Sequence, residues 1–110
     1  MKTEHVLERA MAVVRSRYGE NLTLEKVAQS VHISPFYLSH LLKEKHGFTF
    51  TEYLTRVRMD QAKVLLAGTG RSVRQVAVDV GYSDAGYFTK VFGREVGVTP
   101  GSYRKEHATL

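Results

Sequence analysis

The sequence contains no cysteine and no tryptophan, and only two prolines among its 110 residues. The absence of cysteine excludes disulfide bonds, thiolate zinc sites and cysteine nucleophiles, and it is compatible with a reducing compartment. No apolar run approaches the length of a membrane span, and the N-terminus has no apolar segment typical of a signal peptide. These absences favour a globular protein of the cytoplasm.

Motifs for catalysis and metal binding are also missing. The five histidines lack HExxH or other ligand spacing. Gly68-Thr69-Gly70 lacks the rest of any phosphate-binding fingerprint and is typical of a helix break. No recognisable motif pairs a nucleophile with a base. We therefore predict that the chain is not an enzyme and binds neither a cofactor nor a metal.

The charge balance is basic. The 16 Lys and Arg residues exceed the 11 Asp and Glu residues, which gives a net charge of +5 and a pI near 9.6. A basic chain suits a polyanionic partner such as nucleic acid, although charge alone does not identify one. The length allows one domain, or two very small ones that share a linker.

The most informative feature is an internal duplication, in which residues 27–53 recur in diverged form at residues 76–103. Each copy predicts a short helix with a small residue in its middle, a tight turn, and a second helix opened by serine. This is the layout of a helix-turn-helix, whose second helix can enter a DNA major groove. The paired positions are Val27/Val76, Ala28/Ala77, Val31/Val80 and Ser34/Ser83 and then, after one extra residue in the second copy, Tyr37/Tyr87, Leu38/Phe88, Gly47/Gly97, Thr49/Thr99 and Tyr53/Tyr103.

Helical periodicity covers nearly the whole chain, so the predicted fold class is all-α with seven helices. Ser34-Pro35 is a sharp helix start, and capping boxes are predicted at Thr49–Glu52 and Ser72–Gln75. Either Ser83 or Asp84 is expected to cap the helix that follows. The predicted helices lie near residues 5–18, 24–31, 35–46, 50–67, 73–80, 85–96 and 100–106.

These helices predict one domain over residues 1–110. Its parts are a first helix-turn-helix at 19–48, a linker helix at 49–68 and a second helix-turn-helix at 71–98. A connector of about 17 residues spans roughly 25 Å. Together with the widths of the two motifs, it can cover the roughly 34 Å between successive major grooves on one face of DNA.

Several motifs together carry a family resemblance. They are Leu24-x-x-Val27-Ala28, Ser34-Pro35-x-Tyr37-Leu38-Ser39, Gly47-x-Thr49-Phe50, Arg58-x-x-x-Ala62, Val76-Ala77-x-x-Val80-Gly81-Tyr82-Ser83-Asp84 and Gly97-Val98-Thr99-Pro100-x-x-Tyr103-Arg104. With them, the chain from about Val6 to Lys105 resembles the DNA-binding domain of the AraC/XylS family of bacterial transcription regulators.

The resemblance implies two helix-turn-helix modules joined by a long helix, which bind asymmetric double-stranded DNA sites at promoters. Members of this family mostly carry a separate sensor or dimerisation domain, so we expect the chain to be part of a longer regulator. RNA polymerase is a further expected partner. The leading helix and the SPxYLS pattern look most like the output domains of receiver-containing response regulators.

By family position, the base-reading residues of the first module are Phe36, Ser39 and His40. Phe36 can contact a thymine methyl group, Ser39 can donate or accept a hydrogen bond, and His40 can bind a base edge or a phosphate. The second module carries Ala85, Gly86 and Lys90 at the matching positions, and among these only Lys90 has a side chain that can reach a base. We therefore expect weaker sequence reading by the second module.

Phosphate contacts are expected from basic and polar side chains near both second helices. The alternative for each of these charges is an ordinary solvated surface position. The residues are Lys43, Lys45, Arg71, Arg74, Thr89, Arg94 and Arg104.

Two rival functions fit parts of the pattern. The basic helices can instead form a protein-interaction module, for example one that contacts RNA polymerase with little reading of DNA sequence. Domains of this kind also accompany alkyl-transfer repair enzymes, but the absence of cysteine argues against that chemistry within this chain.

Overall fold

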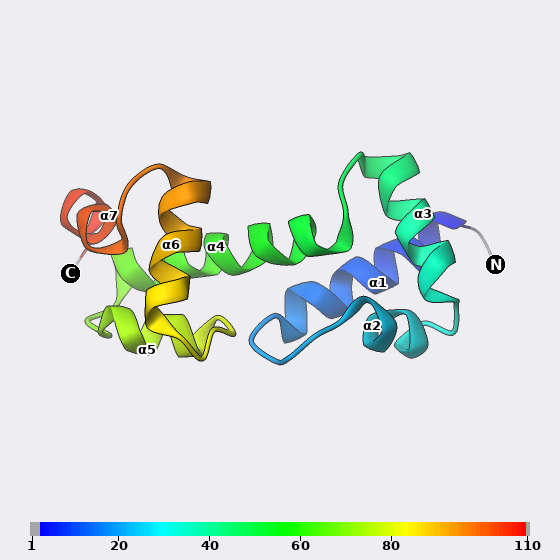
Figure 1. Ribbon diagram of the computed structural model, residues 1–110, viewed down its shortest axis with the longest axis horizontal. Coiled ribbons are helices and arrows are strands. Elements are labelled where there is room, and N and C mark those ends of the chain that lie inside the picture. Colours follow the sequence, from blue (N-terminus) through cyan, green and yellow to red (C-terminus); the bar gives the residue numbers. More distant parts are fainter. Residues whose placement is uncertain (1–2, 110) are drawn as a thin grey trace. The chain divides into compact units, whose positions relative to one another are not determined.

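The structure is a computed structural model that describes residues 3–109, and this range contains seven α-helices and no strand. This confirms the predicted all-α class, and the helix ends fall within about two residues of the predicted ones. Figure 1 shows the helices in chain order, which are α1 (Thr3–Arg17), α2 (Leu24–Ser30), α3 (Pro35–His46), α4 (Phe50–Gly68), α5 (Val73–Asp79), α6 (Ala85–Val96) and α7 (Pro100–His107).

The chain forms two compact units, Met1–Val57 and Arg58–Leu110, and their boundary falls within α4. Each unit contains one predicted helix-turn-helix, α2–α3 in the first and α5–α6 in the second. Each half of the duplication therefore has its own set of internal contacts.

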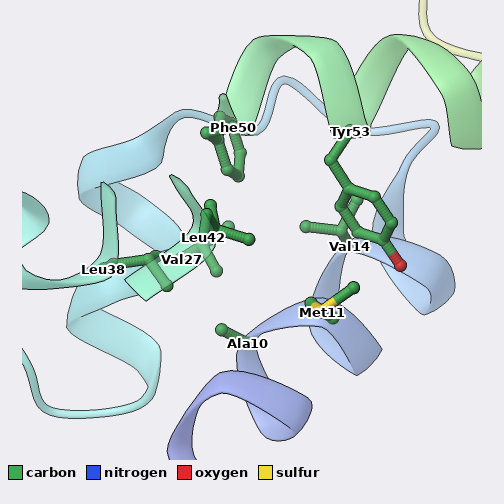
Figure 2. Close-up of a pocket in the computed structure, with 8 residues that line it drawn as sticks. All are labelled: Ala10, Met11, Val14, Val27, Leu38, Leu42, Phe50 and Tyr53. Atoms are coloured by element: carbon green, nitrogen blue, oxygen red, sulfur yellow. The ribbon is translucent and has the colours of Figure 1, made fainter. Parts of the chain in front are cut away.

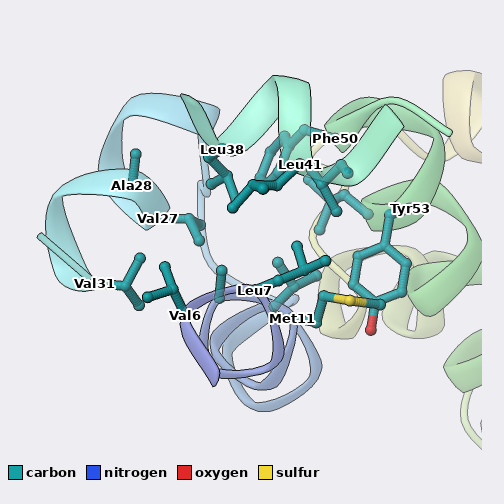
Figure 3. Close-up of a cluster of buried hydrophobic side chains, with 14 of the residues drawn as sticks. Val6, Leu7, Met11, Val27, Ala28, Val31, Leu38, Leu41, Phe50 and Tyr53 are labelled. Atoms are coloured by element: carbon teal, nitrogen blue, oxygen red, sulfur yellow. The ribbon is translucent and has the colours of Figure 1, made fainter. Parts of the chain in front are cut away.

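The core of the first unit is built from α1, α2, α3 and the start of α4 (Figure 3). On α1, Leu7, Ala10 and Val14 recur at helical spacing and are all buried. Ala28 on α2 is completely buried, and its small side chain lets α2 and α3 pack closely. The apolar stripe of α3 (Leu38, Leu41 and Leu42) is part of the same core.

A small hollow marks the place where these four helices meet (Figure 2). At this junction the Tyr53 hydroxyl accepts a hydrogen bond of 3.1 Å from Arg15, whose guanidinium also contacts Glu8 at 2.8 Å. These contacts join α4 to α1 within the first unit, so the hollow is a feature of core packing. It is lined by Ala10, Met11, Val14, Val27, Leu38, Leu42, Phe50 and Tyr53.

The core of the second unit contains a series of aromatic rings. Phe88 and Phe92 are completely buried, with their ring centroids 5.8 Å apart. Phe92 in turn meets Tyr103 of α7 edge to face at 5.8 Å, a favoured geometry for aromatic pairs. The remaining buried side chains come from α4 to α7 and the turn after α5. They are Met59, Ala62, Leu66, Val76, Ala77, Val80, Val91 and Pro100.

Six helix starts are capped by a side-chain oxygen that accepts from the backbone N–H three residues later. Ser34 caps α3 as predicted, and the choice left open for α6 is settled by Asp84, which accepts from the Tyr87 amide at 3.0 Å. The extra residue of the second copy thus moves the cap by one position. The six caps are Thr23, Ser34, Thr49, Ser72, Asp84 and Thr99.

The two predicted capping boxes differ in the structure. Thr49 and Glu52 form the full reciprocal pair, with hydrogen bonds of 2.8 and 3.1 Å. Ser72 also accepts from the Gln75 amide, but the Gln75 side chain donates to Asp79 at 3.0 Å. A full box at Ser72 was therefore a wrong prediction. The side-chain amide of Gln75 donates to the Asp79 carboxylate, a strong acceptor, and this bond holds the glutamine side chain one turn further along α5.

The turn between the two helices of each motif needs a left-handed backbone. In the second unit Gly81 occupies this position, with φ of 107°. In the first unit the equivalent residue is His32, with φ of 62°, and it is the only non-glycine residue with positive φ within the described range. The same turn is therefore made by an unstrained residue in one copy and a strained one in the other.

Candidate nucleic-acid interface

The exposed face of α3 is formed by Phe36, Ser39, His40 and Lys43. Their spacing of three and four residues places them on one side of the helix, opposite the buried Leu38. Phe36 is 82% exposed, which is unusual for a large apolar side chain. The structure thus brings the three predicted base-reading residues of this module together on one uncovered surface.

His40 has a charged neighbour on this face. Its Nε2 lies 3.3 Å from one carboxylate oxygen of Glu44, one turn further along α3. The other carboxylate oxygen of Glu44 lies 3.9 Å from Lys45 Nζ. Sequence reasoning did not single out Glu44, although its spacing of four residues from His40 was a usable signal.

The two lysines of α3 that are predicted to bind phosphate, Lys43 and Lys45, lie on different sides of the helix. Lys43 shares the exposed face with His40, and its ammonium donates to the Gly47 carbonyl at 3.3 Å. Lys45 lies two residues later, about 200° further round the helix, and so projects from another side. Of the two, only Lys43 continues the surface that Phe36 begins.

The matching face of α6 has little side-chain surface. Gly86 and Gly93 stand where α3 has Phe36 and Lys43, and a methyl group at Gly93 would have open space around it. The Thr89 hydroxyl donates to the Ala85 carbonyl of its own helix at 2.9 Å. Lys90 is exposed, and its ammonium has no hydrogen bond or ion pair within residues 3–109. Lys90 is therefore the side chain of this face most available to a ligand.

The other residues predicted to contact phosphate differ in whether they already form an ion pair within the protein. Arg71 pairs with Asp79 at 3.0 Å, and Arg94 pairs with Glu95 at 3.0 Å. Arg74 is exposed on α5 without a hydrogen bond or ion pair in the described part of the chain. Surface pairs such as the first two are weak, so a phosphate can replace the carboxylate.

Arg104 has an internal role. Its Nε donates to the Leu66 carbonyl at 2.9 Å, and its Nη2 reaches the carbonyls of Thr69, at 3.5 Å, and Arg71. The last carbonyls of a helix have no partner within that helix, and Arg104 supplies one for the end of α4. Its predicted phosphate contact stays a prediction, but the guanidinium is already held by backbone groups.

Two tyrosines near the starts of α3 and α6 were missed as candidate site residues. Tyr37 is 41% exposed and Tyr87 is 55% exposed, although each directly precedes a completely buried or nearly buried position. The duplication pairs them without indicating a role for either. Their exposure could have been predicted, because adjacent residues on a helix point in different directions. When the residue after each tyrosine enters the core, the tyrosine itself cannot.

Two other classes of site find no support in the structure. No helix in residues 3–109 is long and apolar enough to cross a membrane. Within the same range, no three His, Cys, Asp or Glu side chains are grouped so that they could hold a metal ion.

The family model described as a helix-turn-helix domain matches residues 27–106, which includes both modules and α4. The chain belongs to the AraC-type helix-turn-helix domains. This places the duplication, the shared α4 and the exposed second helices in a family of DNA-binding domains of transcription regulators.

Among the relatives of this AraC-type domain is the HTH-type transcriptional regulator YijO of Escherichia coli strain K12, which is 36% identical over 106 residues (96% of this chain and 38% of YijO). Another is the bifunctional transcriptional activator and DNA repair enzyme AdaA of Bacillus subtilis strain 168, 34% identical over 92 residues (84% of this chain and 44% of AdaA). The chain therefore spans less than half the length of each of these relatives.

A solved structure agrees with the fold over nearly the whole chain. The C-terminal domain of AraT, a response regulator from Geobacillus stearothermophilus, superimposes with a TM-score of 0.91 and 34% sequence identity, and the match covers 96% of this chain and 88% of that one. The similarity includes α1, which lies outside the residues that the family model matches.

Proposed function

We propose that this AraC-type domain binds double-stranded DNA at specific sequences and regulates transcription at a bacterial promoter, in the cytoplasm. The observation that carries the proposal is the exposed face of α3, where Phe36, Ser39 and His40 lie together and are not used by the core. A helix of this kind fits the major groove, and these side chains can read base edges and methyl groups.

The two modules have different roles in this proposal. The first reads sequence, with Phe36 against a thymine methyl group and Ser39 and His40 at base edges. The second holds DNA mainly by its backbone, through Lys90, Thr89 and Arg94, since Gly86 offers no side chain to a base. Lys90 can also reach a guanine. Lys43, Lys45, Arg71, Arg74 and Arg104 are the further candidates for phosphate contacts.

The proposal is tested by selecting duplexes from a randomised DNA library and titrating the chosen duplex and a scrambled one. We expect His40→Ala to cost about 1–3 kcal/mol on the selected duplex and to relax the preference at one base pair. Lys90→Ala should weaken both duplexes by similar factors, because a phosphate contact does not read sequence. If Lys90→Ala abolishes discrimination and His40→Ala preserves it, the roles of the modules are reversed.

Further partners belong to the same proposal. A sensor or dimerisation domain preceding this segment is supported by the greater length of the relatives, and by the description of AraT as a response regulator. RNA polymerase is the proposed second macromolecular partner. Its binding to the promoter-bound domain can be measured by a supershift with purified polymerase, and failure to supershift would leave DNA binding as the sole function.

A protein-interaction module is the second candidate. The exposure of Phe36, at 82%, and of Tyr87, at 55%, favours it, since exposed aromatic side chains are common at protein interfaces. This candidate predicts equal affinity for selected and scrambled duplexes. A DNA-repair activity like that in the description of AdaA is not proposed, because the chain has no cysteine to accept an alkyl group.

A further inference from the structure

Glu44 is an unexpected residue on a surface proposed to bind DNA. It lies on the same side of α3 as His40, its carboxylate is about half exposed, and its position corresponds to Arg94 in the second module. A carboxylate near DNA phosphates is repelled by them whatever the base sequence, so Glu44 lowers the affinity for every duplex. Only a contact that depends on sequence can offset this cost.

The contact between Glu44 and His40 indicates how Glu44 can affect the choice of DNA sequence. His40 Nε2 faces the carboxylate at 3.3 Å, and a carboxylate can only accept hydrogen bonds. Glu44 therefore favours a proton on Nε2. In a neutral imidazole this leaves Nδ1 as an acceptor, and the second acid oxygen is directed towards Lys45, at 3.9 Å.

We propose that Glu44 is a specificity-determining residue, which positions His40 so that its imidazole accepts a hydrogen bond from a base with an exocyclic amine. In the major groove such amines are adenine N6 and cytosine N4, whereas guanine presents only acceptors there. This inference rests on the proposed function, since it assigns a further residue, Glu44, to the reading surface of α3. The alternative is that Glu44 is a solvated surface charge that has no effect on sequence preference.

Two substitutions of Glu44 separate the effect of its charge from its effect on the position of His40. Glu44→Gln removes the charge but keeps an oxygen that can accept from His40 Nε2, whereas Glu44→Ala removes both. Glu8→Gln is the matched control, because Glu8 is also an exposed carboxylate in an ion pair, with Arg15, but lies on α1. Melting curves of all variants establish that they are folded before binding is measured.

The experiment is library selection at pH 8 followed by titration of the selected and scrambled duplexes. We expect the wild-type chain to prefer one base pair at the position that loses its preference in His40→Ala. Glu44→Ala should lose about five- to tenfold of the discrimination at that base pair. Glu44→Gln should keep most of it and bind both duplexes about two- to threefold more tightly, since one repulsive charge is gone.

A double-mutant cycle completes the test. Glu44→Ala combined with His40→Ala should discriminate no worse than His40→Ala alone, because Glu44 acts through the imidazole. Unchanged discrimination in Glu44→Ala or additive losses in the double variant would each overturn the inference. If the wild-type chain prefers no sequence at all, the proposed function itself fails, and the two failures are thereby distinguished.

Discussion

His32 and Gly81 occupy equivalent places in the two modules, and they differ in how well they tolerate the left-handed backbone of the turn. His32 has φ of 62° and is exposed, so its side chain contributes little packing to offset the strain. We predict that His32→Gly stabilises the protein by about 0.5–1 kcal/mol, because glycine adopts positive φ without a steric cost.

Urea denaturation measures this effect. The control is Gln29→Gly, in the exposed part of α2, which should destabilise the protein by about 0.5–1 kcal/mol, since glycine weakens a helix. Equal destabilisation by both substitutions would show that the turn does not strain His32.

Gly81 is constrained by space as well as by its backbone. A Cβ at this position would lie 2.8 Å from the Arg58 guanidinium, which stacks over the Tyr82 ring with 5.3 Å between Arg58 Cζ and the ring centroid. We predict that Gly81→Ala destabilises the second unit by about 1–3 kcal/mol, through positive φ and displacement of Arg58.

Gly93→Ala is the matched comparison, since Gly93 lies inside α6 with open space around its Cα. It should stabilise the helix by about 0.5–1 kcal/mol. Thermal melting of the two variants gives shifts of opposite sign if the constraint is local to Gly81, and shifts of the same sign contradict it.

At the scale of helices, the Thr49–Glu52 capping box links stability to pH. The hydrogen bond from the Thr49 backbone N–H, the largest effect, lowers the pKa of Glu52 below its ordinary value of 4.5. A carboxyl group whose pKa is depressed on folding stabilises the protein above its unfolded-state pKa. That contribution is lost as the pH falls through the folded-state pKa.

We therefore predict that Glu52→Ala lowers the melting temperature at pH 7 and that the difference from wild type shrinks steadily below pH 4.5. The measurement is a series of melting curves at closely spaced pH values. A difference that is the same at pH 7 and at the lowest pH would show that the glutamate acts by helix propensity and not by its charge.

The C-terminal end of α4 is closed by α7 and the residues after it. Arg104 binds the carbonyl of Leu66, and Thr109 binds that of Ala67 through both its backbone amide and its hydroxyl, at 2.9 and 3.1 Å. We predict that Arg104→Lys, which keeps the charge but loses the fork of donors, destabilises the second unit by about 1–3 kcal/mol.

Lys105→Met is the control, because Lys105 is an exposed cation on the same helix. It should change stability by less than about 0.5 kcal/mol. If Arg104→Lys melts like the wild type and Arg104→Met only weakens DNA binding, the side chain serves the phosphate contact predicted from the sequence.

The helices were predictable because their starts carry local chemistry. Ser34-Pro35 and Thr49–Glu52 specify a cap from neighbouring residues alone, and both form as expected. Gln75 was not predictable in the same way, since its side chain can either accept from the Ser72 backbone N–H or donate to Asp79, and it donates to Asp79 in the folded helix. Local signals decide where a helix begins, and competition among partners decides which hydrogen bonds it keeps.

The candidate site was predictable in part for a related reason. Phe36, Ser39 and His40 follow from the period of α3 once its buried side is known. The internal role of Arg104 was not visible, because its carbonyl partners lie 33 to 38 residues away in the chain. A cation far from its partner in sequence looks the same as a solvated one until the fold is known.

For the whole molecule, the basic charge should dominate the dependence of DNA binding on salt. If about 5–8 phosphates are contacted, the slope of log affinity against log salt concentration should lie near −5 to −7. The measurement is a titration series at several salt concentrations with the selected duplex. A slope near zero would argue decisively against DNA as the partner.

Both units should contribute to that slope, since both keep the helix-turn-helix core. Lys90→Ala should reduce the slope by about one unit if Lys90 binds a phosphate. Footprinting of the wild-type chain should show protection over roughly two helical turns of DNA. Protection of a single groove would show that the second unit does not engage.

The residues that fold each module and the residues that face outward from α3 and α6 are separate sets. Both copies have a capped second helix, a left-handed turn and an apolar stripe, although the cap and turn residues differ. The outward positions differ in chemistry, with Phe36 and His40 on α3 and Gly86 and Lys90 on α6. Heritable changes on the outward faces can therefore accumulate without loss of the fold. If the exposed side chains of α3 read DNA as proposed, substitution of a few of them should change the preferred DNA sequence while the fold is preserved.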